Sequence, residues 1–284
     1  MGIKVCHIST VHKKNDIRIF HKECKALAAA GYDVVYISPG KHLESEGGVI
    51  LRGSGMPAGW HKARRLTAGC RITIKAALAE DADIYHIHDG ELSRFIKRLK
   101  KAGSNVVYDS HEHLPMQIFE KEWIPPLLRK PVSRIADIVE MRSVRNADLI
   151  IAVADKTVER FQNLGIKIIK LENLPILGEF EGIRIDPAVR AAGRKVCYSG
   201  TIWIERGLDT MCAAVREMGN RCFLEIAGRI DHGNPAKFTG GSDSNIRYSG
   251  YLSRDELFRV YEESAAGLCL FKPFPNNMID PPTK

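Results

Sequence analysis

Apolar and polar positions divide the first half of the chain into alternating short runs and longer periodic segments. Runs rich in β-branched residues predict strands at Ile3–Ser9, Val34–Ser38, Ile84–His88, Val106–Ser110, Leu149–Ala154 and Ile166–Leu171. Apolar residues at helical spacing predict helices at Asp16–Ala30, Trp60–Ala79, Glu91–Ala102, Val132–Asn146 and Lys156–Leu164. Such alternation is typical of a parallel sheet covered by helices on both faces.

The alternation lapses after Asn173 and then restarts. Residues 175–194 contain several prolines and glycines and are predicted to be a linker. Beyond it we expect further strands and helices at Lys195–Ser199, Glu205–Met218, Cys222–Ala227, Ile246–Tyr248, Arg254–Glu263 and Gly267–Phe271. The sequence therefore predicts an α/β protein with two Rossmann-like domains, residues 1–174 and 195–284, the second of them incomplete.

Composition limits the classes of protein to which the chain can belong. No apolar run approaches the roughly 18–20 residues that a membrane span requires. The N-terminus leads directly into a strand and lacks the layout of a signal peptide. The seven cysteines are scattered singly, which is typical of reduced thiols rather than of a disulfide or zinc framework. We therefore expect a cytoplasmic protein.

The net charge of +8 is distributed unevenly. Residues 1–172 hold 28 Lys and Arg against 20 Asp and Glu, whereas residues 173–284 hold 14 of each. A positive first domain favours an anionic partner or surface, and the alternative is a basic face that only meets water. Nucleic acid is not among the partners that we predict.

Two stretches of the first domain have the character of basic amphipathic helices. Residues 60–79 hold five basic and no acidic residues, and most of their apolar residues fall on one face of a helical wheel. Residues 123–145 repeat the theme. Such helices can lie on anionic lipid, so we expect peripheral membrane association. The alternative is that each helix packs its apolar face on its own sheet.

Polar residues gather where several predicted strands end. Three of these ends are in the first domain: His7 to His12 with Asp16 and Arg18 beyond, His86 to Asp89, and Asp109 to His113. Ligands of open α/β sheets bind at the carboxyl ends of the strands, so these side chains are candidates for a site. The alternative for each histidine is a satisfied place in the core.

Two other functions compete for the same residues. The pairs His86/His88 and His111/His113 are possible metal ligands, but no HExxH or Cys/His finger spacing supports them, and we expect no metal. The segment 53–59 resembles a dinucleotide-binding loop, yet its third glycine is one residue late and a proline interrupts it. We interpret this segment as a flexible loop.

The first strand of the second domain ends at Ser199-Gly200-Thr201, and Arg206 lies at the start of the next helix. A glycine turn lets backbone N–H groups approach a diphosphate, and a helix N-terminus favours negative charge there. Arg206 would add a bidentate cation. The alternative is an ordinary turn with a surface arginine.

Together these segments resemble GT-B glycosyltransferases of the large retaining family 4. The motifs of the first domain are K-V-C-H-I-S-T-V-H-K-K-N-D-I-R-I-F-H-K-E-C (4–24), D-I-Y-H-I-H-D-G-E-L (83–92), Y-D-S-H-E (108–112) and A-D-L-I-I-A-V (147–153). Those of the second domain are Y-S-G-T-I-W-I-E-R-G-L (198–208), L-E-I-A-G (224–228) and the terminal P-P-T-K. Their order and spacing cover nearly the whole chain.

The resemblance implies two domains that face each other across a cleft. It implies a nucleoside-diphosphate sugar held mainly by the second domain, an acceptor held by the first, and no metal or other cofactor. The catalytic positions would be His111, Asp16 and His88. The acceptor side would comprise His12, Arg18, Asp89 and Glu112. The donor side would comprise Gly200, Thr201, Arg206, Tyr251 and Lys284.

The resemblance also implies that part of the donor site lies outside this chain. Family members carry two glutamates eight positions apart near the donor, and the second would follow Lys284. The resemblance thus implies transfer of a sugar to a glycan or lipid-linked acceptor, with retention, in surface polysaccharide or glycoconjugate synthesis. A sugar-nucleotide epimerase of the same fold and an inactive binding fragment remain as alternatives.

Overall fold

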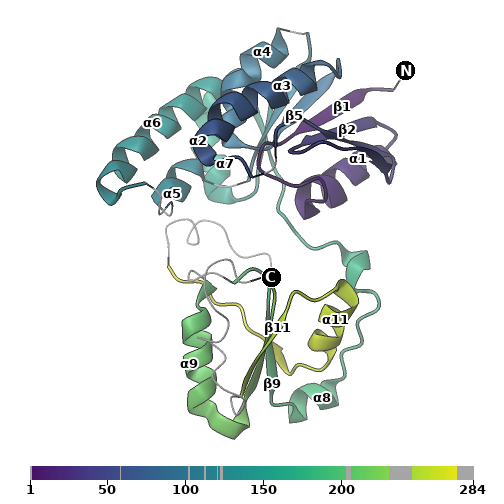
Figure 1. The fold of residues 1–284 in the computed structure, drawn as a ribbon, viewed down its shortest axis with the longest axis vertical. Coiled ribbons are helices and arrows are strands. Elements are labelled where there is room, and N and C mark those ends of the chain that lie inside the picture. The colour runs from purple at the N-terminus through teal and green to yellow at the C-terminus, as the bar shows by residue number, and fades with distance from the viewer. Residues whose placement is uncertain are drawn as a thin grey trace. The chain divides into compact units, whose positions relative to one another are not determined.

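A computed structural model describes most of the chain, namely residues 2–57, 59–101, 103–111, 113–119, 121, 124–202, 206–229 and 245–273. The chain divides into two compact units, Met1–Leu174 and Pro175–Lys284. Each unit contains one sheet with its own helices (Figure 1). The predicted Glu112 and Lys284 lie outside the described residues.

The first unit is built on an eight-stranded sheet in the order β3-β4-β2-β1-β5-β6-β7-β8. Its strands are β1 (Lys4–Ile8), β2 (Asp33–Ser38), β3 (Leu43–Glu46), β4 (Val49–Gly53), β5 (Ile84–Ile87), β6 (Asn105–Ser110), β7 (Leu149–Ala152) and β8 (Lys167–Lys170). All neighbours pair in parallel except β3 and β4, which are antiparallel. The sequence did not predict β3, because all four of its residues are exposed and it has no apolar face.

The helices of the first unit also follow the predicted alternation, with shifted ends. They are η1 (Ile17–Cys24), α1 (Lys25–Ala29), α2 (Lys62–Arg64), η2 (Arg65–Gly69), α3 (Cys70–Leu78), η3 (Gly90–Phe95), α4 (Ile96–Lys100), α5 (Leu114–Phe119), α6 (Pro126–Val144), α7 (Asp155–Phe161) and η4 (Gln162–Leu164). α6 begins six residues before the predicted Val132 and passes through Pro131. A proline in the first turns of a helix is tolerated more readily than one in the middle.

The two faces of the first sheet have different character. On one face, residues of α3, α4, α6 and α7 form the main core with alternate strand residues such as Cys6, Ile8, Tyr85 and Ile87. On the other face, Ile19 and Phe20 of η1 pack on β2 and β4. Because side chains alternate along a strand, His7, His86 and His88 face the side opposite the main core.

The segment around α3 shows which interpretation of residues 60–79 holds. Cys70, Ile74 and Ala77 are fully buried in the main core, and the basic Arg71 and Lys75 are exposed. The apolar face of this segment therefore packs on its own sheet, as the alternative interpretation expected. α6, in contrast, exposes several large apolar side chains, among them Leu127 and Ile135.

The second unit contains a four-stranded parallel sheet in the order β11-β10-β9-β12. Its elements are η5 (Leu177–Phe180), α8 (Pro187–Ala192), β9 (Lys195–Ser199), α9 (Leu208–Met218), η7 (Gly219–Arg221), β10 (Phe223–Ala227), β11 (Ile246–Gly250), α11 (Arg254–Glu262) and β12 (Ala266–Gly267). The segment predicted to be a linker thus holds two short helices. β12 is shorter than the strand predicted at Gly267–Phe271.

Candidate active site

The carboxyl ends of β1 and β5 lie side by side in the middle of the first sheet. β1 pairs with β2 on one side and with β5 on the other, so the order of the strands reverses its direction between β1 and β5. Ligands of open α/β sheets bind at such a switch point, outside the carboxyl ends of the strands. His88 and Asp89 follow β5 here, and Ser9 and Thr10 follow β1.

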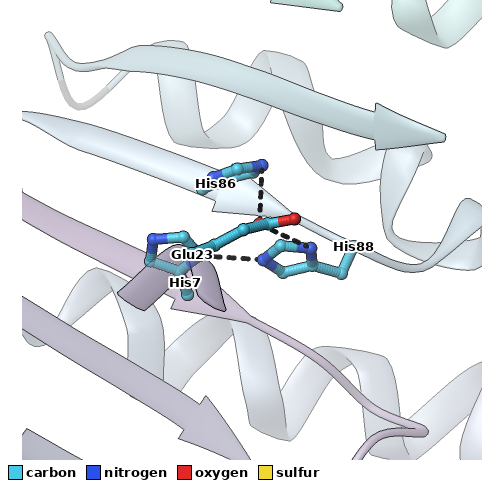
Figure 2. A group of neighbouring side chains, drawn as sticks. All are labelled: His7, Glu23, His86 and His88. Carbon is cyan, nitrogen blue, oxygen red and sulfur yellow. Dashed lines mark hydrogen bonds and ion pairs between the residues drawn. The ribbon is translucent and has the colours of Figure 1, made fainter. Parts of the chain in front are cut away.

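Three histidines lie deepest in this region. His7 pairs directly with His86 in the sheet register, and His88 follows two residues later on the same face (Figure 2). The Nδ1 atom of His7 lies 2.9 Å from Nε2 of His88. Burial lowers the pKa of His88 to about 3 and holds the pKa values of His7 and His86 well below the usual range. All three rings are therefore neutral near pH 7.

A buried arginine joins two carboxyl groups beside these histidines. Nη2 of Arg18 donates to both oxygens of Asp109 at 3.1 Å, and Nε of Arg18 lies 3.0 Å from Oε1 of Glu23. Burial raises the pKa of Asp109, but the neighbouring histidines and Arg18 outweigh burial and hold it well below the usual range. Burial and the Asp109 charge raise the pKa of Glu23 to about 9. Near neutral pH, Asp109 is thus ionised and Glu23 is protonated.

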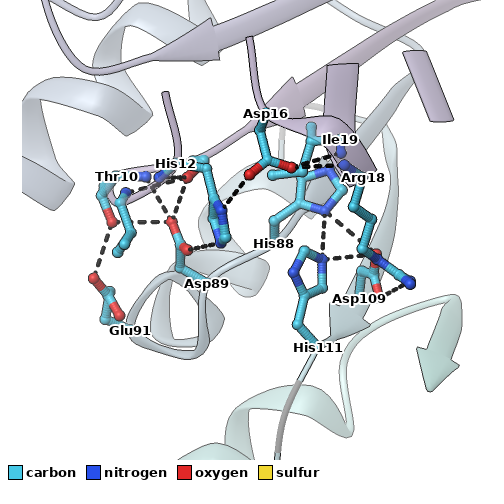
Figure 3. Close-up of polar contacts among 12 residues, drawn as sticks. Thr10, His12, Asp16, Arg18, Ile19, His88, Asp89, Glu91, Asp109 and His111 are labelled. Atoms are coloured by element: carbon cyan, nitrogen blue, oxygen red, sulfur yellow. Dashed lines mark hydrogen bonds and ion pairs between the residues drawn. The ribbon is translucent and has the colours of Figure 1, made fainter. Parts of the chain in front are cut away.

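His111 is the outermost member of a chain of imidazoles. Its Nε2 lies 2.9 Å from Oδ2 of Asp109 and 3.1 Å from Nδ1 of His88 (Figure 3). The His111 side chain is 15% exposed, whereas that of His88 is fully buried. An imidazole oriented by a buried carboxylate and open to solvent has the geometry of a general acid or base.

A second imidazole–carboxylate pair lies on the loop after β1. His12 Nδ1 is 2.9 Å from Oδ2 of Asp16, and the rings of His12 and His111 are 5.4 Å apart between centroids (Figure 3). Asp89 holds the same loop, because its Oδ2 accepts hydrogen bonds from Thr10 N at 2.6 Å and Ser9 Oγ at 3.0 Å. The two pairs therefore flank one region of the surface.

The structure brings together most of the predicted residues of the first domain, which are His12, Asp16, Arg18, His88, Asp89 and His111. His88 and Arg18 are too deeply buried to meet a substrate without movement. The resemblance assigned no role to His7, Glu23 or Asp109, although His7 and Asp109 lie in the polar clusters at the strand ends. For Asp109 a signal was available, since it lies two positions before His111 on the same strand edge. For Glu23 the spacing offered none.

Gly200, Thr201 and Tyr251, three of the predicted donor residues, follow the carboxyl ends of strands β9 and β11 in the second sheet. Gly200, with φ of 125°, follows β9, and its N–H donates to the carbonyl of Ala227 at 2.9 Å. That N–H therefore serves the fold rather than a diphosphate. Thr201 is exposed, Tyr251 is 87% exposed, and the Arg206 guanidinium lies 4.2 Å from the centroid of the Phe271 ring.

Gly200 lies beside a second glycine, Gly228, whose position allows no side chain. A Cβ atom built on Gly228, at φ of 138°, would lie 1.9 Å from the carbonyl oxygen of Gly200. The ends of β9 and β10 thus approach each other as only a glycine allows. At Gly200 itself, the φ of 125° and the hydrogen bond of its N–H to Ala227 show that this glycine serves the local backbone conformation.

Comparison with known proteins identifies the kind of molecule that carries this arrangement. The family profile of the glycosyl transferase 4-like domain matches residues 18–176 of the chain, which include most of the site in the first unit. None of the curated proteins compared with the chain matches it significantly in sequence.

Solved structures show that the fold is that of GT-B glycosyltransferases. Sucrose-phosphate synthase from Thermosynechococcus elongatus superposes with a TM-score of 0.69 at 14% identity, covering 92% of this chain and 74% of that one. A trehalose-phosphate synthase from Burkholderia vietnamiensis gives 0.63 at 13% identity, covering 95% and 77%. HepE from Anabaena, solved with UDP and glucose, gives 0.60 at 11% identity, covering 96% and 76%.

The caps of η1 lead to a prediction about stability and pH. Asp16 accepts from the backbone N–H groups of Arg18 and Ile19 at 2.9 Å each. Burial raises the pKa of Asp16, but the hydrogen bond and charge of His12 and the backbone donors lower it to about 2. A carboxyl group whose folded pKa lies below its unfolded value of about 3.9 stabilises the protein above that pH and loses this contribution as pH falls toward 2.

Replacing Asp16→Asn should therefore lower the free energy of unfolding near neutral pH by about 1–2 kcal/mol, allowing for partial exposure. Urea unfolding followed by circular dichroism between pH 7 and pH 3 measures the difference from wild type. That difference should shrink below about pH 4. A difference that stays constant with pH would show that the charge of Asp16 contributes nothing.

Proposed function

The chain belongs to the glycosyl transferase 4-like family, and from this premise we propose that it moves a sugar from a nucleoside-diphosphate sugar to a glycan or lipid-linked acceptor. The proposal includes retention at the anomeric carbon and a place in surface polysaccharide or glycoconjugate synthesis. The observation that carries it is the pair of imidazole–carboxylate contacts, His111 with Asp109 and His12 with Asp16, at the switch point of the first sheet.

His111 is the residue that we propose to meet the reacting sugar. Asp109 orients the ring by the contact of 2.9 Å, and an N–H group of His111 would stabilise charge that develops during transfer. His12 and Asp16 would bind acceptor hydroxyl groups on the same side. Arg18 and His88 act through their neighbours, because they hold Asp109 and His111 in place.

The second unit is proposed to bind the diphosphate. Because the Gly200 N–H is already engaged, the contacts must come from groups beyond it. Thr201 is exposed and can donate its hydroxyl, and Arg206 supplies a guanidinium whose stacking on Phe271 fixes its plane. Structures with the same fold are described with UDP bound, which favours a uridine nucleotide as the first probe.

Removal of Arg206 tests the donor site. A charged hydrogen-bond donor to a phosphate contributes about 1.5–3 kcal/mol, so Arg206→Ala should weaken UDP or GDP binding at least tenfold in isothermal titration. Arg221→Ala is the matched control, since Arg221 lies in η7 beyond the other end of α9. Equal nucleotide affinity in the Arg206 variant and in wild type would overturn the assignment.

Removal of His111 tests the catalytic role. We expect His111→Ala to reduce transfer from a nucleoside-diphosphate sugar by about 10²–10⁴-fold while nucleotide affinity and the circular dichroism spectrum stay unchanged. Release of nucleoside diphosphate is the readout. Turnover within a few fold of wild type would show that His111 is structural, and product formation without any acceptor would indicate an epimerase instead.

Membrane association is a second part of the proposal, and α6 is the element that supports it. No helix among the described residues is long and apolar enough to span a bilayer. α6 nevertheless exposes apolar and basic side chains along one face, namely Leu127, Leu128, Lys130, Arg134, Ile135, Ile138, Val139 and Arg142. Leu127 is 92% exposed and Ile135 61%.

The two acidic residues of α6 are both paired with Arg160, although only Glu140 is buried and the Asp137 side chain is 45% exposed. Glu140 is buried and pairs with Arg160 and with the hydroxyl group of Tyr108, and Asp137 pairs with the same arginine at 2.6 Å. The exposed face therefore carries only positive charge among its apolar residues. This combination fits an anionic lipid surface, because lipid covers the apolar groups and neutralises the basic ones.

Co-sedimentation with vesicles tests this surface. Binding should rise with anionic lipid and fall with salt. Ile135→Gln with Ile138→Gln should weaken it, and Arg134→Glu should weaken it about fivefold or more, since one basic residue contributes about 1 kcal/mol. Lys167→Glu, on β8, is the control. Absence of binding to anionic vesicles at low salt would contradict the proposal.

A further inference from the structure

The four residues His7, Glu23, His86 and His88 form a compact buried group at the end of β1 and β5. Each offers one ligand atom, and the four atoms lie within 4.8 Å of one another (Figure 2). The centroid of the His86 ring lies 4.5 Å from that of the His7 ring and 4.4 Å from that of the His88 ring. Glu23 reaches the group from η1, which covers this face of the sheet.

Several polar atoms of this group have no hydrogen bond within the described part of the chain. They are Nε2 of His7, Nε2 of His86 and Oε2 of Glu23, whereas Oε1 of Glu23 forms an ion pair with Nε of Arg18 at 3.0 Å. Buried polar atoms in folded proteins are nearly always satisfied, and each exception costs about 1–3 kcal/mol. Three unsatisfied atoms on residues of one compact group therefore indicate a missing partner that accepts lone pairs.

The distances from Glu23 to the histidines favour a metal ion between them over direct hydrogen bonds. Nε2 of His86 and Nδ1 of His88 each lie 3.9 Å from Oε2 of Glu23, which is too long for a hydrogen bond. Two ligands of a tetrahedral zinc ion, with bonds of 2.0–2.1 Å, are separated by about 3.4 Å. Small side-chain rotations would bring the ligand atoms to that separation.

We propose that His7, Glu23, His86 and His88 bind a single divalent transition-metal ion, with zinc as the expected occupant. Three imidazoles and one carboxylate form a donor set that suits zinc, and the buried setting favours a closed four-coordinate site of structural type. The cation would offset the buried carboxyl of Glu23, which otherwise adjoins that of Asp109. The metal itself has no role in the sugar transfer proposed above, although His88 belongs to both groups.

A second group of possible ligands overlaps the first but fits less well. Glu23, His88, Asp109 and His111 also place one ligand atom each within 4.8 Å. However, both oxygens of Asp109 accept from Arg18, and His111 contacts Asp109 at 2.9 Å. These two residues already satisfy each other and Arg18, and they are therefore better placed outside the metal site.

Metal analysis of the full chain tests the proposal. Protein produced in zinc-supplemented medium and dialysed against a weak chelator should retain about one zinc ion per chain. Chelator-treated protein titrated with Co²⁺ should develop the strong visible absorption of four-coordinate cobalt, and added zinc should abolish it. Zinc should also raise the unfolding temperature of the metal-free protein.

Variants locate the ion. His86→Gln and Glu23→Gln, which preserve size, should each lower bound zinc at least tenfold, whereas His113→Gln, outside both groups, should leave it unchanged. His111→Ala separates the two groups, because zinc retained in that variant supports the deeper one. Zinc lost with His111 but kept with His86, or neither zinc nor cobalt bound by the wild type, would overturn the proposal. Since the readouts are metal content and absorption, they do not depend on glycosyltransferase activity.

Discussion

The buried ion pair between Arg18 and Asp109 is the interaction on which the site of the first unit depends. Removing two charges from water costs several kcal/mol each, and the attraction offsets this only where the geometry is good and the remaining polar atoms are bonded. Here both oxygens of Asp109 accept hydrogen bonds from Arg18, and one of them also contacts His111. The guanidinium of Arg18 makes a third contact, with Glu23. Loss of either partner would leave an uncompensated buried charge.

The same pair links the helix side of the site to the sheet. Arg18 is on η1 and Asp109 is on β6, so the pair fixes the distance between the loop after β1 and the end of β6. His12 and Asp16 lie on that loop, and His111 follows that strand. The relative positions of the two imidazole–carboxylate pairs thus depend on one internal contact rather than on surface residues.

Sequence periodicity predicted the strands of the first unit except β3, and it predicted the edge at which the polar residues meet. It did not predict the place of Glu23. An α-helix has 3.6 residues per turn, so residues five positions apart, such as Arg18 and Glu23, would point in different directions. The first helix is instead wound as a π-helix, in which hydrogen bonds join residues five apart, and this brings the two side chains to 3.0 Å. Sequence alone does not reveal such a local change of pitch.

The same limit applies to glycines and to amphipathic helices. Their sequence patterns show which contacts they can make, but the packing of the fold decides which contacts they do make. Gly200 has the freedom to approach a phosphate, yet its neighbour across the sheet is Gly228, and backbone packing takes its N–H. The segments around α3 and α6 are both basic and amphipathic. α3 buries its apolar face in the main core, whereas on α6 the buried ion pair of Glu140 with Arg160 lies on the inner side and several apolar residues stay exposed. Where polar groups take the buried side of a helix, its hydrophobic residues must find another partner, and the positive charge around them favours an anionic one.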